Sequence, residues 1–163
     1  MSYEVSTKQL LPIACVACRL TFTICNASDI MSVIENEKVK VLIIDDNRDA
    51  ADTLACLLQI LGFQADFRTD GRSGILAAQQ MVPDVVLLDI GMPIMDGYET
   101  AGLLRCAPEL QRCKIVALTA WGDFETRKVA EASGFHWLLT KPASVQSLMS
   151  VLNLDSQSDG FEH

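Results

Sequence analysis

The sequence predicts an α/β protein with one doubly wound, five-stranded parallel sheet covered by helices on both faces. Short apolar runs alternate five times with amphipathic stretches between Val39 and Leu152, a pattern typical of a parallel sheet with crossover helices. Four of the five apolar runs lead directly into Asp, Thr or Lys. For five strand–helix units of this kind we expect the strand order 2-1-3-4-5.

The first two units are predicted from periodicity and from the residues that interrupt it. The run VKVLII is rich in branched residues, as in a strand buried on both faces, and Gly62 ends the helix that follows. Pro83 interrupts the second helix. The expected elements are a strand over Val39–Ile44, a helix with apolar positions from Ala51 to Leu61, a strand over Gln64–Arg68 and a helix over Ser73–Met81.

The remaining three units follow the same logic. The runs DVVLL and KIVAL are further buried strands, and Gly134 closes the polar helix between the fourth and fifth strands. The expected elements are strands over Asp84–Leu88, Lys114–Leu118 and His136–Leu139, with helices over Asp96–Cys106, Asp123–Ser133 and Val145–Leu152.

Length and composition limit the classes of function. The 163 residues suit one domain with short extensions, and a hydrophobic content of 50% allows a full core. The formal net charge of −8 and the lack of a basic cluster disfavour nucleic acid as a partner. We expect an N-terminal extension over residues 1–37, the α/β domain over 38–153 and a polar tail over 154–163.

The N-terminal extension contains an apolar segment from Leu10 to Cys25. It is shorter than a membrane span and contains Pro12 and Arg19, and the residues before it lack the net positive charge of a signal peptide. We therefore expect no membrane association. A second hypothesis is that translation naturally starts at Met31, because charged residues and then a strand follow it directly.

Six cysteines allow two interpretations. Cys15, Cys18 and Cys25 could contribute to a metal site, although such sites usually need four ligands. The simpler interpretation is reduced thiols in a cytoplasmic protein, and this is our expectation.

Polar residues at the strand ends carry the prediction of a site. Asp45 and Asp46 follow the first strand, Asp89 the third and Thr119 the fourth, and Lys141 comes after the fifth. In such a sheet, ligands bind beyond the carboxyl ends of the strands. Three carboxylates there would repel one another unless joined by a cation, and their oxygens suit Mg²⁺. With a lysine and a threonine hydroxyl, the site could hold a phosphoryl group on a carboxylate nucleophile.

Each of these residues also has a structural interpretation when it is taken alone. Asp45 and Asp46 could lie in a solvated loop or cap the next helix, and Asp89 could cap a turn. Thr119 alone suits a structural role, and Lys141 alone suits a surface charge. Their joint placement at corresponding strand ends favours the functional interpretation.

Four motifs at these positions resemble the receiver domain of bacterial response regulators in two-component signalling. They are VLIIDDN (Val41–Asn47), LLDIGMPIMDGYE (Leu87–Glu99), ALTAW (Ala117–Trp121) and LLTKP (Leu138–Pro142). The resemblance extends from Val39 to about Leu152. It implies a flavodoxin-like fold, consistent with the expected strand order.

The resemblance implies a role for each matching residue. Asp89 would accept the phosphoryl group, and Lys141 would contact it. Asp46 would ligate Mg²⁺ directly, Asp45 largely through water, and the backbone carbonyl of Gly91 would be a further ligand. Thr119 would move to a phosphoryl oxygen, and the Lys141–Pro142 peptide bond would be cis.

Two aromatic positions are open. The family often has Tyr or Phe three residues before the lysine, where this chain has Leu138, and we expect the neighbouring Trp137 to pack in or near the core. Trp121 could shield the phosphoryl group from water or be an exposed loop aromatic.

The leading functional hypothesis is a stand-alone receiver that is not an enzyme acting on a substrate. A histidine kinase or histidine phosphotransfer protein would phosphorylate it. Because only about ten residues follow the last helix, we expect the signal to leave through an unknown downstream protein, contacted around the fourth strand, fourth helix and fifth strand. We expect a monomer or weak dimer.

Two alternatives remain at this point. One is a degenerate receiver that binds partners without phosphorylation, which the complete set of acids, Thr119 and Lys141 disfavours. The other is a Mg²⁺-dependent phosphohydrolase. The usual second aspartate two residues after the nucleophile is absent, because Gly91 stands there.

Overall fold

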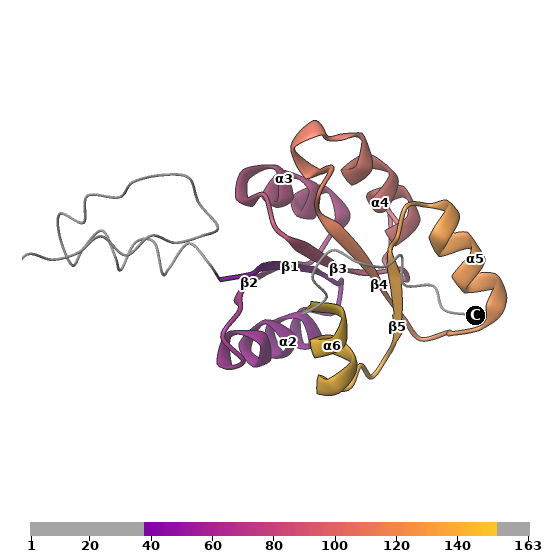
Figure 1. The fold of residues 1–163 in the computed structure, drawn as a ribbon. Helices are drawn as coiled ribbons and strands as arrows, with labels where there is room; N and C mark the ends of the chain where they lie inside the picture. The colour runs from indigo at the N-terminus through magenta and orange to yellow at the C-terminus, as the bar shows by residue number, and fades with distance from the viewer. Residues whose placement is uncertain (1–37, 153–163) are drawn as a thin grey trace, which may run out of the picture. The chain divides into compact units, whose positions relative to one another are not determined.

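A parallel five-stranded sheet with the strand order β2-β1-β3-β4-β5 forms the centre of the fold (Figure 1). The computed structural model describes residues 38–152. All neighbouring strands are parallel, with Val41 opposite Val85, Val85 opposite Lys114, and Val116 opposite Trp137. The strands are β1 (Lys40–Ile44), β2 (Gln64–Arg68), β3 (Val85–Asp89), β4 (Lys114–Thr119) and β5 (Trp137–Thr140). The predicted fold class and strand order are confirmed.

Helices cover both faces of this sheet. In Figure 1, α2 and α6 lie on one face, and α3 and α4 lie on the other, with α5 beside β5. The helices are α2 (Arg48–Ile60), α3 (Gly71–Met81), α4 (Gly97–Cys106), α5 (Phe124–Ala132) and α6 (Val145–Leu152), with a short 3-10 helix, η1 (Pro108–Leu110). Within residues 38–152, no helix combines the length and apolar character needed to cross a membrane.

The core is divided between the two faces by the alternation of side chains along each strand. In β1, Leu42 and Ile44 pack with buried residues of α3 and α4, whereas Val41 and Ile43 pack with those of α2 and α6. All four side chains are fully buried. A nearly unbroken apolar run was therefore the right signal for a strand enclosed on both sides.

Four helices begin with an Asx side chain that accepts a backbone hydrogen bond. The caps precede α2, α3, α4 and α5 and are Asn47, Asp70, Asp96 and Asp123. Each satisfies an N–H group that the helix cannot pair internally, which stabilises a helix by about 1 kcal/mol. Because these caps fix where the helices start, they also fix the lengths of the loops after β1, β2, β3 and β4.

The observed boundaries correct several predicted ones by one to three residues. Asp89 and Thr119 are the last residues of β3 and β4 rather than the residues after them, because their backbones continue the ladder. Asp96 and Asp123 are caps with extended backbones rather than helical residues. The 3-10 helix η1 was not predicted. The hypotheses on Cys15, Cys18 and Cys25, on Met31, and on the 154–163 tail lie outside the described residues.

Candidate functional site

Lys141 joins the ends of the first and third strands through two ion pairs. Its Nζ lies 2.6 Å from Oδ2 of Asp45 and 3.1 Å from Oδ1 of Asp89. Asp45 is 3% exposed and Asp89 is 7% exposed, so both carboxylates are recessed below the surface. The residues come from the ends of β1 and β3 and from the loop after β5, as the strand-end pattern predicted.

Asp46 completes an acidic cluster with Asp45 and Asp89. One carboxylate oxygen from each of the three residues lies within 4.8 Å of the others. Unlike its two partners, Asp46 is exposed. A cluster with two recessed acids and one accessible acid suits an oxygen-ligated cation that can enter from solvent.

Backbone groups orient two of these carboxylates. Asn47 N–H donates to Oδ1 of Asp45 at 2.9 Å, and Gly91 N–H donates to Oδ1 of Asp89 at 3.3 Å. Sequence reasoning did not single out Asn47. Its position after the two aspartates and before a helix is the signal that could have identified it.

Opposing effects act on the pKa of Lys141. Its partial burial lowers the pKa, but the hydrogen bonds and charges of Asp45 and Asp89 outweigh this and raise it overall. Lys141 is therefore a cation at neutral pH. One ammonium group cannot balance three carboxylates, so the site retains an excess of negative charge that a divalent cation could neutralise.

Thr119 is the last residue of β4, and its hydroxyl forms a hydrogen bond with the backbone of the loop that follows. Its side chain is buried, and Oγ1 accepts a hydrogen bond from Trp121 N–H at 3.1 Å. Its backbone carbonyl accepts from Lys141 N–H at 2.7 Å, which connects β4 to the lysine loop. Lys141 and Pro142 are joined by a cis peptide bond, as the resemblance implied.

The two aromatic positions have different environments. Trp137 is half-buried against the core, with Lys114 Nζ located 5.4 Å from its ring centroid, so the expectation that it packs near the core is confirmed. Leu138 packs against the other core cluster. Trp121 is 72% exposed, as expected for a loop aromatic.

Gly97 allows the acceptor strand and α4 to approach closely. A Cβ atom there would collide with the backbone carbonyl oxygen of Asp89 and lie 2.7 Å from Cα of Ile90. The N–H of Gly97 donates to the carbonyl of Ile90 at 3.1 Å. The first residue of α4 is thus held directly against the backbone of the predicted acceptor.

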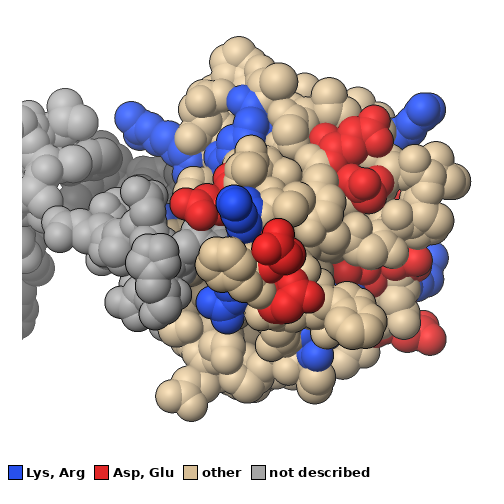
Figure 2. Space-filling model, turned by 90° about the vertical axis from the view of Figure 1, so that its right-hand side faces the viewer, with Lys and Arg blue, Asp and Glu red and all other residues tan. Residues whose placement is uncertain are grey.

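The surface shown in Figure 2 carries separate groups of acidic side chains with Lys and Arg between them. No continuous basic patch is seen among the described residues on this face.

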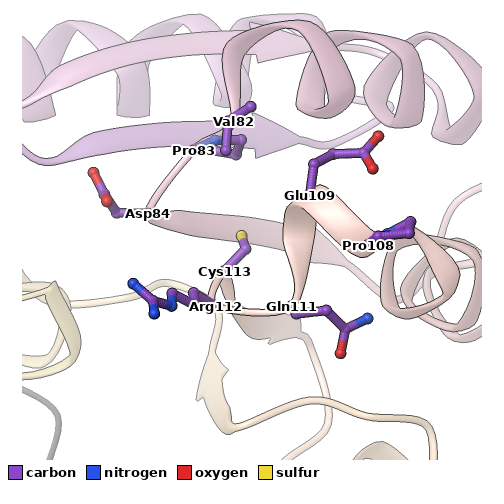
Figure 3. A pocket seen from close by; sticks show the side chains of 8 residues that line it. All are labelled: Val82, Pro83, Asp84, Pro108, Glu109, Gln111, Arg112 and Cys113. Atoms are coloured by element: carbon purple, nitrogen blue, oxygen red, sulfur yellow. The ribbon is translucent and has the colours of Figure 1, made fainter.

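A separate pocket of about 390 Å³ lies at the opposite, amino-terminal edge of the sheet. Figure 3 shows the sulfur of Cys113 pointing into the space between Asp84 and Glu109. Burial raises the pKa of this thiol to about 12, so it is not a thiolate at neutral pH. The pocket shares no lining residue with the acidic cluster.

Comparisons with known proteins agree with this geometry. Residues 41–153 match the family model for the response regulator receiver domain. Protein PilH of Pseudomonas aeruginosa is 32% identical over 115 residues, which is 70% of this chain and 94% of PilH. The transcriptional regulator RpaA of Synechocystis is 30% identical over 111 residues, which is 68% of this chain but 46% of RpaA. Some relatives thus contain much more than the matched region.

Solved structures show the same fold. The chemotaxis protein CheY4 of Vibrio cholerae has a TM-score of 0.68 and 29% identity, covering 71% of this chain and 96% of that one. The receiver domain of the sensor histidine kinase PA1611 of Pseudomonas aeruginosa has a TM-score of 0.65 and 26% identity. That comparison covers 71% of this chain and 94% of the PA1611 domain, whose structure has a magnesium ion in the active-site cleft.

Proposed function

The chain belongs to the response regulator receiver domain family, and from this premise we propose that Asp89 accepts a phosphoryl group from a histidine kinase or a histidine phosphotransfer protein. Receiver domains are generally phosphoacceptors rather than enzymes that turn over a substrate. The phosphorylated domain then signals through contacts with a downstream protein.

One observation carries the proposal: two acids that follow β1, the acid that ends β3 and a lysine after β5 lie close together. Lys141 Nζ contacts Asp45 and Asp89 at 2.6 Å and 3.1 Å, although Lys141 and Asp45 are 96 residues apart in the chain. Buried carboxylates in close contact destabilise a fold unless they are compensated. This combination of recessed nucleophile, cation and accessible acid suits reversible phosphorylation better than a purely structural role.

The acidic cluster also fits Mg²⁺, which the receiver domain of PA1611 binds in its cleft. Oxygens of Asp45, Asp46 and Asp89 lie within 4.8 Å of one another, and carboxylate oxygens are the kind of ligand that Mg²⁺ prefers. The backbone carbonyl of Gly91 would be a further ligand. When bound, Mg²⁺ would supply positive charge for the phosphoryl oxygens and offset the repulsion between the carboxylates.

The chemical step transfers a phosphoryl group between two proteins. A carboxylate oxygen of Asp89 attacks phosphorus, the phosphorus–nitrogen bond of the phosphohistidine breaks, and its electron pair leaves with the imidazole nitrogen. Lys141, already beside Asp89, would pair with a phosphoryl oxygen. The Thr119 hydroxyl would leave its hydrogen bond with Trp121 N–H to donate to another phosphoryl oxygen, which would change the loop after β4.

The test is to incubate the full chain with acetyl phosphate and MgCl₂ and to measure its intact mass. We expect one phosphate adduct that is lost in Asp89→Asn and on removal of Mg²⁺ with EDTA. Asp84→Asn is the matched control, because Asp84 precedes the same strand at its other end, and it should keep the adduct. Absence of an adduct from any small donor would refute the proposal and support a binding module that is independent of phosphorylation.

A further inference from the structure

β2 forms one edge of the sheet, and among residues 38–152 its outer side has no partner strand. It is the first strand in the order β2-β1-β3-β4-β5 and pairs only with β1 (Figure 1). A strand at an edge normally presents a row of unpaired N–H and C=O groups, which another chain can use to extend the sheet. The outer backbone groups of β2 are therefore a potential attachment point for a second strand.

The backbone groups of Ala65 and Phe67 point toward this open side. At the two ends of β2, the N–H of Gln64 and the carbonyl of Arg68 are bonded to residues that flank β1, at 3.0 Å and 3.1 Å. In a parallel strand, the N–H and C=O groups of every second residue face the same neighbour. Alternate residues of β2, beginning with Gln64, thus face β1, and the two residues between them face outward.

Side chains of the chain itself bind three of the four outward groups. Gln59 Nε2, near the end of α2, donates to the carbonyl of Ala65 at 2.8 Å. Phe67 N–H donates to Oδ1 of Asp66 at 2.8 Å, and the carbonyl of Phe67 accepts from Nη1 of Arg68 at 2.6 Å. We call Gln59, Asp66 and Arg68 the edge guard. A strand that paired fully with this edge would have to displace all three side chains.

The two charged members of the edge guard hold each other in place. Side chains alternate along a strand, so residues 66 and 68 share one face, while Ala65 and Phe67 pack into the core on the α2 side. Arg68 Nη1 lies 2.9 Å from Oδ2 of Asp66, so one nitrogen bonds both the carboxylate and the Phe67 carbonyl. The pair therefore occupies the N–H and the C=O of one outward residue at once.

The stability of the fold does not account for this arrangement. The side chains of Arg68 and Asp66 are 36% and 51% exposed, and exposed ion pairs contribute little to stability. Their bonds to Phe67 are local and join no distant parts of the chain. What the three side chains share is that each ends on an outward backbone group of the same edge.

We propose that Gln59, Asp66 and Arg68 prevent the open edge of β2 from pairing with the same edge of a second copy of this chain. Two copies related by a twofold axis could pair their β2 strands in antiparallel fashion, because each would present the same surface to the other. The edge guard satisfies the outward groups within one copy, and the sheet therefore ends at β2. This inference goes beyond the proposed function, because it concerns self-association and involves no side chain of the acidic cluster.

The test removes the edge guard from the full chain without changing its net charge. The triple variant Gln59→Ala, Asp66→Thr and Arg68→Thr loses one acid and one base, and threonine suits a β-strand. Sedimentation equilibrium measures the dissociation constant of the dimer, which we expect to fall at least tenfold below the wild-type value or below its lower limit. As the triple variant dimerises, the amides of Ala65 and Phe67 should exchange hydrogen more slowly, because they would lie in the new interface.

Two further variants control for charge and for the location of the interface. Asp52→Ala combined with Arg72→Ala also removes one acid and one base, at exposed positions of α2 and α3, which both contact β2. This pair should self-associate like the wild type. Ala65→Pro, added to the triple variant, removes an outward N–H and leaves the bonds to β1 intact. It should restore the wild-type dissociation constant.

The single variant Arg68→Thr keeps the test decisive if the triple variant does not fold. It frees only the carbonyl of Phe67, and it should lower the dissociation constant by a smaller factor, about threefold. An unchanged dissociation constant in the folded guard variants would overturn the proposal. Equal self-association of the control pair would also overturn it. A dimer in which the amides of Ala65 and Phe67 exchange as fast as in the monomer would do the same, because the copies would then meet elsewhere.

Discussion

Arg105 shows how a single side chain can hold three segments of this fold together. From α4, its Nε donates to the carbonyl of Gly134 at 2.9 Å and its Nη1 to the carbonyl of Cys113 at 2.8 Å. Its Nη2 contacts Nδ1 of His136 at 2.7 Å, a nitrogen that also receives Ile115 N–H. Nδ1 is therefore an acceptor. Burial lowers the pKa of Arg105, but a guanidinium remains charged at neutral pH.

We expect Arg105→Lys to lower the free energy of unfolding by about 2 kcal/mol. Lysine keeps the charge, but its single nitrogen cannot reproduce a planar fork bonded to three partners. Urea unfolding followed by circular dichroism measures the difference. Arg112→Lys is the matched control: it replaces an exposed arginine of the same region and should change stability by less than about 0.5 kcal/mol. If both substitutions lower the free energy of unfolding equally, the hydrogen bonds of the Arg105 guanidinium contribute nothing to stability.

At the scale of secondary-structure elements, α4 is placed by its contact with the acceptor strand. Asp96 caps the helix by accepting from Glu99 N–H at 2.8 Å, and Gly97 follows it against the backbone of β3. Gly102, one and a half turns later, has no atom within 4 Å of an added Cβ. The two glycines of α4 therefore differ: a side chain at position 97 would collide with the backbone of β3 and the residue after it, whereas a side chain at position 102 would meet open space.

Gly97→Ala should destabilise the fold by at least about 2 kcal/mol, because a methyl group would overlap backbone atoms that cannot rotate away. Gly102→Ala should stabilise it by about 0.5 to 1 kcal/mol through the higher helix propensity of alanine. Chemical denaturation of both variants tests the pair. If Gly97→Ala leaves the free energy of unfolding unchanged, α4 can move away from Asp89 without a loss of stability.

The helices and strands were predictable because their signals are local. Apolar runs, periodicity and turn residues placed all five strands and the helices α2 to α6 within a few residues. The capping roles of Asp96 and Asp123 and the short helix η1 were missed, because they depend on backbone angles that composition does not specify.

At the scale of the whole molecule, the acidic cluster links cation binding to stability. Three carboxylates within 4.8 Å and one lysine leave uncompensated repulsion in the folded state, which the unfolded chain lacks. A cation that binds only the folded chain stabilises it by mass action. The site should thus affect the unfolding of the entire domain.

We expect MgCl₂ to raise the melting temperature, with a stabilisation of about 2.7 kcal/mol when its concentration is a hundred times its dissociation constant. Asp89→Asn should raise the melting temperature in the absence of Mg²⁺, by relieving repulsion, and should reduce the response to Mg²⁺. Glu131→Gln, which removes an exposed acid on α5, should respond to Mg²⁺ like the wild type. Scanning calorimetry, with NaCl at matched ionic strength, provides the measurement. A Mg²⁺ response that persists unchanged in Asp89→Asn would place the cation elsewhere.

The sequence by itself determined the sheet, its strand order and the identity of the residues at the strand ends, because alternating apolar runs admit few topologies. Only the tertiary structure decided that Lys141 contacts both Asp45 and Asp89, that Thr119 is bonded to Trp121, and that Arg105 joins three segments. It also revealed the positive φ of the fully exposed Ile94 in the loop between β3 and α4. These features depend on contacts between residues far apart in the chain and on backbone angles in the loops, and neither leaves a periodic signal in the sequence.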